Sequence, residues 1–138
     1  MATPRSFTHY ESSTRNKVAM VYAAHEGVYV SAVFDAVELT GLRREQLADL
    51  LHISMKTLLR HQQENKKLSP GNSEWVLKLI ALFQQGKTVF GGVAAFRGWL
   101  GKPAFGLGNQ TPYDLLATVG GMDLIADELT RIEYGDLA

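Results

Sequence analysis

Residues 89–121 indicate the fold of this chain most directly: VFGGVAAFRGWLGKPAFGLGNQTPYDLLATVGG. Glycines separate short apolar runs, which predicts short helices with defined ends, since glycine commonly ends a helix. Thr111 is expected to cap one helix, with Pro112 at its first position, where a missing N–H costs nothing. Asp114 then lies in the first turn, where an acid favours the helix dipole. The side chains expected to be buried are Trp99, Leu100, Leu107, Leu115 and Leu116. The stretch contains no catalytic constellation and indicates a compact helical binding module.

The order and spacing of these elements resemble the C-terminal toxin-binding domain of the Xre/MbcA/ParS antitoxins of bacterial toxin–antitoxin operons. The matching elements are Val89-Phe90-Gly91, Ala95, Trp99-Leu100, Pro103, Leu107-Gly108, Thr111-Pro112, Leu115-Leu116, Gly120, Arg131-Ile132 and Tyr134-Gly135. With the N-terminal region described below, the resemblance covers nearly the whole chain after about residue 15.

The resemblance implies an antitoxin of a type II toxin–antitoxin pair whose partner carries a RES domain and destroys cellular NAD⁺. It implies that the C-terminal domain covers the active-site cleft of this toxin. It further implies that the N-terminal domain holds dimers on the operator DNA of its own operon.

Composition excludes several classes of protein. The chain has 138 residues, enough for one domain or two very small ones, and it has no cysteine for disulfides or thiolate metal sites. No stretch approaches the roughly eighteen apolar residues of a membrane span. The polar N-terminus lacks the pattern of a secretory signal, so the expected location is cytoplasmic.

The sequence lacks the residue patterns typical of metal sites and nucleotide-binding loops. His52 and His61 are nine residues apart, and no histidine pair has metal-ligand spacing. Gly106-Leu107-Gly108 lacks the preceding strand and the GxGxxG spacing of a nucleotide-binding loop. We therefore expect no metal, no cofactor, no small-molecule substrate and no enzymatic activity.

The zero net charge conceals a modest asymmetry. Residues 1–70 carry nine Lys and Arg against seven Asp and Glu, whereas residues 71–138 carry five against seven. The window 43–67 has six basic and three acidic residues. This excess gives weak support for nucleic-acid binding, because the usual footprint is a strongly basic domain.

Residues 1–14 have no periodicity and are predicted to form a flexible tail. From Arg15 to Glu26 a helix is expected, with Val18, Val21 and Tyr22 on its apolar side and its end at Gly27. A second helix is expected from a Ser31 cap to Gly41. The run 28–30 between them reads as a linker, although it could pair as a strand.

Residues 44–62 have the spacing of a helix-turn-helix. Leu47, Leu50 and Leu51 are expected on the buried face of the first helix, with small Ala48 at the crossing point. His52 occupies a turn position often held by glycine, and histidine tolerates the left-handed conformation better than most residues. Ser54 is expected to cap the second helix, with Leu58 on its inner side. The alternative is a helical hairpin used only for packing or dimerisation.

If the motif binds DNA, the second helix points its N-terminal side chains at base edges in the major groove. The hydroxyl groups and cations on this helix suit phosphate and base contacts, and further cations flank it. The predicted DNA-binding residues are Arg43, Arg44, Ser54, Lys56, Thr57, Arg60, Lys66 and Lys67.

The polar stretch 65–72 combines proline with glycine and marks the predicted boundary between a DNA-binding domain at 15–70 and a toxin-binding domain at 71–138. The helix that follows has Trp75, Leu79, Leu82 and Phe83 on one stripe and further apolar residues beside it. An all-α fold results, with an N-terminal helix-turn-helix bundle packed with a small C-terminal helical domain. The two-sided apolar helix also suggests a homodimer.

The final helix is expected from about Met122 to Glu133, with Leu124, Ile125, Leu129 and Ile132 facing inward. The end of the chain carries an aromatic residue, a flexible glycine and acidic groups, which suit a cationic NAD⁺ pocket. The alternative is that Tyr134 packs back on the helix. The predicted toxin-binding residues are Trp99, Leu107, Arg131, Tyr134, Gly135, Asp136, Leu137 and Ala138.

A second class of function fits the same residues. The chain could be a stand-alone helix-turn-helix transcription regulator whose C-terminal half only dimerises. The antitoxin interpretation requires the C-terminal half to bind a protein partner.

Overall fold

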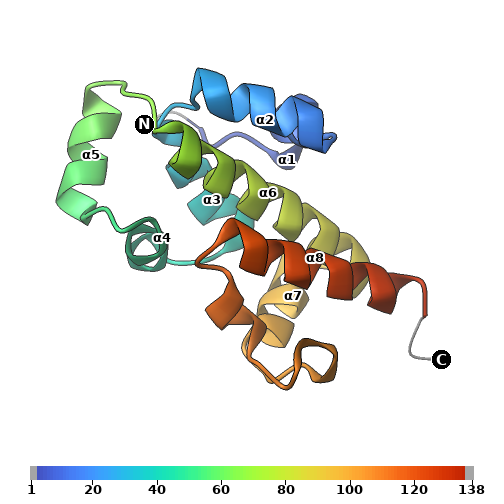
Figure 1. The fold of residues 1–138 in the computed structure, drawn as a ribbon. Helices are drawn as coiled ribbons and strands as arrows, with labels where there is room; N and C mark the ends of the chain where they lie inside the picture. Colours follow the sequence, from blue (N-terminus) through green and yellow to red (C-terminus); the bar gives the residue numbers. More distant parts are fainter. Residues whose placement is uncertain (1–2, 136–138) are drawn as a thin grey trace. The chain divides into compact units, whose positions relative to one another are not determined.

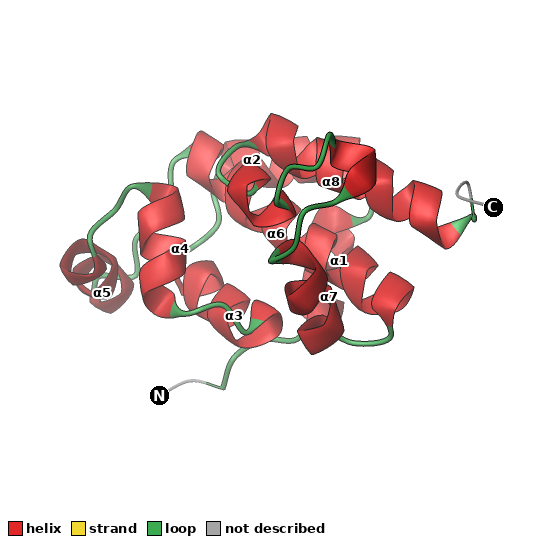
Figure 2. Cartoon of the chain, turned by 90° about the horizontal axis from the view of Figure 1, so that it is seen from below, coloured by secondary structure: helices red, strands yellow, loops and turns green. Residues whose placement is uncertain are grey.

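The computed structural model describes residues 3–135 of the chain. Within this range the regular elements are eight α-helices and two 3₁₀ helices, with no strand (Figures 1 and 2). The predicted all-α fold is confirmed. Among these residues, no helix has both the length and the apolar character needed to cross a bilayer. The chain divides into two compact units, one ending at Ile80 and the second beginning at Ala81.

The first unit contains five helices and the beginning of a sixth. They are α1 (Phe7–Thr14), α2 (Lys17–Glu26), α3 (Ser31–Thr40), α4 (Arg44–Leu51), α5 (Met55–Gln63) and α6 (Pro70–Phe90). Its buried side chains include Val30, Val33, Leu47, Leu58 and Leu77. The predicted helix ends at Gly27 and Gly41 are confirmed, because both residues cap helices through their backbone N–H groups.

The N-terminal segment is not the flexible tail that the sequence suggested. Residues 7–14 form α1, which packs against α2, and Tyr10 is buried. The Tyr10 hydroxyl donates a hydrogen bond to the buried carboxylate of Asp35 on α3, and the Arg5 backbone N–H donates another to it at 3.0 Å. Two donors on one carboxylate, distant in sequence, hold the segment against α3. A periodicity analysis cannot detect such contacts.

The expected apolar stripe of α2 is exposed rather than buried. The side chains of Val18, Val21 and Tyr22 are 63%, 42% and 70% exposed. The buried residues of this helix are Met20 and Ala24. The helix therefore begins and ends close to the predicted residues, but a different side of it faces the core.

The stretch 65–72 is tied to the loop before α3. The backbone N–H of Val30 donates to the carbonyl of Lys66 at 2.9 Å, and that of Leu68 donates to Val28 at 2.8 Å. Tyr29 and Lys67 form an isolated antiparallel bridge. Both alternatives for residues 28–30 thus hold in part, since a single bridge joins two connecting segments. The predicted domain boundary after residue 70 falls at the first turn of α6.

Helix α6 is a single helix of 21 residues that continues through Gly86 to Phe90. Gly86 lies inside this helix, and the ring of Phe96 packs directly on the glycine, where a Cβ atom would not fit. The predicted stripe of Trp75, Leu79, Leu82 and Phe83 is buried within one copy of the chain. One copy of the chain therefore covers this stripe, so the stripe gives no support to the predicted homodimer, which stays a prediction.

The second unit continues from Ala81 through the rest of α6. Its further elements are α7 (Val93–Leu100), the 3₁₀ helices η1 (Phe105–Leu107) and η2 (Pro112–Leu115), and α8 (Val119–Glu133). Pro112 occupies the first turn of η2 after Thr111, as predicted, although the Thr111 side chain makes no capping hydrogen bond. The core includes Phe83, Phe96, Leu116, Ile125 and Leu129.

Helix α8 differs from its prediction at two points. It begins at Val119, because the Thr118 hydroxyl accepts a hydrogen bond from the Gly121 N–H at 2.9 Å and caps the helix. Gly120 and Gly121 thus lie within the first turn instead of preceding the helix. Ile125 and Leu129 face inward as expected, but Leu124 is 53% exposed.

Candidate functional site

The turn between α4 and α5 has the conformation that the sequence predicted. The backbone of His52 has the left-handed conformation, with φ of 58°, and its N–H donates to the Asp49 carbonyl at 3.1 Å. Ser54 then caps α5, accepting a hydrogen bond from the Thr57 N–H at 3.1 Å. The two helices pack against each other, with Ala48 and Leu58 buried. A rigid turn thus fixes the direction of α5.

The outer side of α5 carries the polar residues expected to contact DNA. Lys56 and Arg60 are exposed, whereas Thr57 is half-buried and its hydroxyl bonds to Ser54 at 2.9 Å. Arg60 Nε lies 3.9 Å from a carboxylate oxygen of Glu64, and Lys66 Nζ lies 3.6 Å from the same oxygen. These surface pairs are weak, so both cations can exchange partners.

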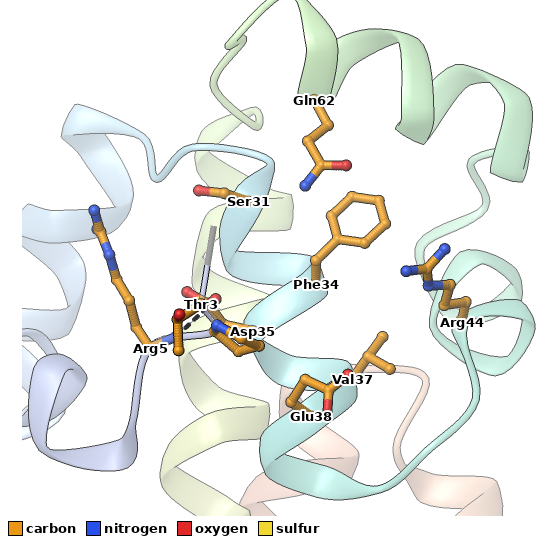
Figure 3. A pocket seen from close by; sticks show the side chains of 10 residues that line it. Thr3, Arg5, Ser31, Phe34, Asp35, Val37, Glu38, Arg44 and Gln62 are labelled. Carbon is orange, nitrogen blue, oxygen red and sulfur yellow. Dashed lines mark hydrogen bonds between the residues drawn. The ribbon is translucent and has the colours of Figure 1, made fainter. Parts of the chain in front are cut away.

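Three of the predicted cations have identifiable local contacts. The Arg43 backbone N–H donates to the Gln46 side chain at 2.9 Å, and Arg43 is exposed at the start of α4. The Arg44 guanidinium lies 5.4 Å from the centre of the Phe34 ring (Figure 3). Lys67 Nζ donates to the Glu26 carbonyl at 3.2 Å, so this ammonium group already has a partner in the chain.

A cavity of about 530 Å³ lies beside α4, between the N-terminal segment, α3 and the end of α5 (Figure 3). Phe34, Asp35, Glu38, Arg44 and Gln62 are among its lining residues. The Asp35 carboxylate is occupied by the two donors described above. Burial and the hydrogen bond to Asp35 raise the pKa of the Tyr10 hydroxyl far above its ordinary value, so this hydroxyl remains a donor.

Trp99 belongs to an aromatic cluster in the second unit. Its ring centre lies 5.5 Å from that of Phe90 and 6.0 Å from that of Phe96, and Phe96 meets Phe83 edge-on at 4.9 Å. The Trp99 side chain is half-buried. Its inner side packs in this cluster, which leaves only part of the indole for a partner.

Leu107 lies in η1, which packs against α8. It is half-buried, whereas the neighbouring Phe105 is 86% exposed. On α8 the Arg131 guanidinium lies 3.4 Å from the buried Glu128 carboxylate. Leu107 and Arg131 therefore lie on two elements, η1 and α8, that pack against each other.

The end of α8 presents Tyr134 with its side chain 75% exposed, and Gly135 follows with φ of 72°. The alternative in which Tyr134 packs back on the helix is wrong. Asp136, Leu137 and Ala138, the other predicted toxin contacts, lie outside the described residues.

Two protein-family models match the chain. Residues 85–135 match the antitoxin Xre/MbcA/ParS C-terminal toxin-binding domain. Residues 19–81 match the antitoxin Xre-like helix-turn-helix domain. The chain belongs to the Xre/MbcA/ParS-type antitoxins. The two matches meet near the division of the two compact units, so each unit corresponds to one family domain.

A curated relative agrees with this antitoxin assignment. The chain is 25% identical over 105 residues to the protein named antitoxin Xre of Yersinia enterocolitica serotype O:8 / biotype 1B. The alignment covers 75% of this chain and 71% of the relative. An antitoxin of this type is a regulator that binds a toxin, which agrees with the prediction that the chain is not an enzyme.

The match to a toxin-binding domain favours the antitoxin over a regulator whose C-terminal half only dimerises. Phe105 is not among the predicted toxin-binding residues, although it lies within this antitoxin domain and is exposed. The available signal was an aromatic residue inside the glycine-rich run 101–108, where few neighbours can cover it.

Proposed function

We propose that this antitoxin neutralises a RES-domain toxin that degrades NAD⁺, by covering the active site of the toxin with the second compact unit. The match of residues 85–135 to a toxin-binding domain is the observation that carries this proposal. The identity of the toxin as a RES protein rests on the family resemblance. The exposed Tyr134 at the end of α8 supports a contribution from the end of the chain.

The test is co-expression of this chain with the protein encoded by the adjacent open reading frame. That protein alone should arrest growth and deplete cellular NAD⁺, and the antitoxin should restore both. Deletion of residues 134–138 should abolish this rescue while the helical content stays unchanged. Growth arrest without loss of NAD⁺ would contradict the RES assignment, and full rescue by the truncated chain would contradict the role of the tail.

We also propose that the first compact unit binds operator DNA and that the antitoxin thereby regulates its own operon. The match to a helix-turn-helix domain and the exposed cations on α5 support this role. Lys56 and Arg60 are proposed to reach base edges, with Arg43, Arg44 and Lys66 on phosphates. Since helix-turn-helix proteins commonly bind two half-sites, a homodimer is proposed on this ground alone.

Gel-shift titrations with the promoter fragment of the operon test the DNA proposal. Arg60→Ala should weaken operator binding by roughly 1–3 kcal/mol if the contact to guanine is bidentate. The double variant Lys56→Ala, Arg60→Ala should still rescue cells from the toxin. Unchanged operator affinity in the double variant would refute the assignment of α5, and light scattering of the free protein tests the dimer.

A further inference from the structure

Phe105 is the most exposed of the large apolar side chains in residues 3–135, with 86% of its surface accessible. A phenyl ring left in water gives up the free energy that burial would provide. The same unit buries Phe83 and Phe96 completely. The second unit thus has a core that buries phenylalanine, and Phe105 is exposed because η1 and its loop hold it outside that core.

The loop that carries Phe105 is closed by its own backbone. The N–H groups of Leu107 and Asn109 both donate to the Ala104 carbonyl at 3.0 Å, and the Ala104 N–H donates to the Gln110 carbonyl at 3.0 Å. Ala104 itself is buried. These bonds fix both ends of the loop, so the ring projects from a fixed base. An interface residue that is already held in place loses less conformational freedom on binding.

The base of the loop is fixed on α8 by a second contact. A Cβ atom added to Gly106 would lie 1.5 Å from Oε2 of Glu128, so the backbone of η1 lies directly against this carboxylate. The Glu128 side chain is only 4% exposed and is paired with Arg131 at 3.4 Å. The glycine, the buried acid and the arginine thus join the loop to the helix next to Phe105.

Two side chains of α8 extend the surface around this contact. Leu124, Glu128 and Arg131 are spaced by four and three residues and so share one side of the helix. Leu124 is 53% exposed, and the Arg131 side chain is 43% exposed. We call Phe105, Leu124 and Arg131 the loop–helix surface. It combines an exposed aromatic ring, a half-exposed aliphatic side chain and a partly exposed guanidinium group.

We propose that Phe105 is the anchor of the toxin interface, inserted in an apolar pocket of the toxin, with Leu124 and Arg131 at its edge. The inference rests on the proposed function, because it takes the toxin as the partner of residues 85–135. All three residues of the loop–helix surface lie inside the range that matches a toxin-binding domain. Aromatic residues and arginine dominate the binding energy of protein interfaces, which fits this composition.

The experiment measures the affinity of the full antitoxin for the protein encoded by the adjacent open reading frame, made catalytically inactive to permit purification. Phe105→Ala should raise the Kd by about 10- to 100-fold, the effect of losing one buried phenyl ring. Phe105→Leu should lose less affinity because it retains part of the apolar surface. Both variants should keep wild-type helical content, since the ring touches solvent.

Tyr22→Ala is the matched control. Tyr22 is an aromatic residue with 70% exposure, on α2 of the other compact unit. Its removal should leave the Kd for the toxin within about twofold. If Phe105→Ala has no larger effect than Tyr22→Ala, the anchor assignment is overturned.

The controls separate this inference from the proposed function. If the wild-type antitoxin does not bind the adjacent gene product, the proposed function fails and the anchor fails with it. If the wild-type protein binds and Phe105→Ala binds equally well, only the anchor is refuted. If Phe105→Ala instead converts a dimer to a monomer with unchanged toxin affinity, the surface joins two copies of the antitoxin and the proposal is wrong.

Discussion

Replacing Gly86 by alanine tests the packing of the second unit. An alanine Cβ at this position would lie 2.3, 2.4 and 2.6 Å from three ring carbons of Phe96, where ordinary contact begins at 3.4 Å. The ring must therefore move by about 1 Å. Its path is restricted because Phe83 lies 4.9 Å away and Phe90 and Trp99 lie 6.0 Å away, measured between ring centres.

Two opposing effects set the change in the free energy of unfolding that Gly86→Ala causes. Overpacking a well-packed core costs about 1–3 kcal/mol. Alanine inside a helix is favoured over glycine by up to about 1 kcal/mol. Since the aromatic neighbours hold Phe96 on three sides, overpacking dominates, and Gly86→Ala should lower the free energy of unfolding by about 1–2 kcal/mol.

Urea unfolding followed by circular dichroism measures this difference, with Gly120→Ala as the control. A Cβ at Gly120 in α8 would meet no atom within 4 Å, so this variant should be as stable as the wild type or gain up to about 1 kcal/mol. If Gly86→Ala were stabilised to the same extent as Gly120→Ala, the close contact with Phe96 would be refuted.

Three further substitutions test contacts in the first unit. Tyr10→Phe removes a donor to buried Asp35 and should cost about 1–3 kcal/mol of unfolding free energy. Because folding raises the pKa of Tyr10, its stabilisation is full below pH of about 10 and is lost progressively as the pH rises from there toward the raised pKa, so the difference between the urea midpoints of wild type and variant should shrink above pH of about 10. His52→Gly should stabilise the protein by up to about 1 kcal/mol, since φ is 58° at this position, and an unchanged thermal midpoint would argue against strain. Ser54→Ala removes the cap on the Thr57 N–H and should cost about 0.5–2 kcal/mol by urea unfolding, whereas Ser54→Asp should retain most of the stability.

Local signals in the sequence predicted local structure well. The left-handed turn at His52, the cap at Ser54 and the helix start at Pro112 each depend on the conformational preferences of one or two residues. Such preferences act over a few bonds, so they can be predicted from the sequence without knowledge of the tertiary structure. The order of helices followed from these signals.

The side of a helix that faces the core was harder to predict. Periodicity identifies an apolar stripe, but it does not say whether the chain itself covers it. In α2 the small Ala24 is buried while Tyr22 is exposed, and in α8 Leu124 is exposed beside buried Ile125. Helix α6 also continues through Gly86, and the close packing of Phe96 on this glycine is a contact that no local pattern encodes.

The residues of the candidate sites also differ in how well the sequence predicts them. The cations of α5 could be chosen by residue type and by their place after a cap. Phe105 could not be chosen by residue type alone, because its proposed role depends on its exposure, and this exposure depends on how η1 is fixed to Glu128. At the end of the chain the structure shows Tyr134 as an exposed side chain, and its contact with the toxin stays a prediction.

The position of Glu64 between Arg60 and Lys66 has a consequence for ionic strength. In the proposed DNA complex, a base edge replaces this carboxylate as the partner of Arg60, and a phosphate group replaces it as the partner of Lys66. The two cations lie 3.9 and 3.6 Å from the carboxylate in the free protein. The released carboxylate then takes up a cation from solution, which offsets part of the counterion release from the duplex. Operator affinity should therefore fall less steeply with salt than the number of phosphate contacts implies. Glu64→Gln should restore the steeper dependence.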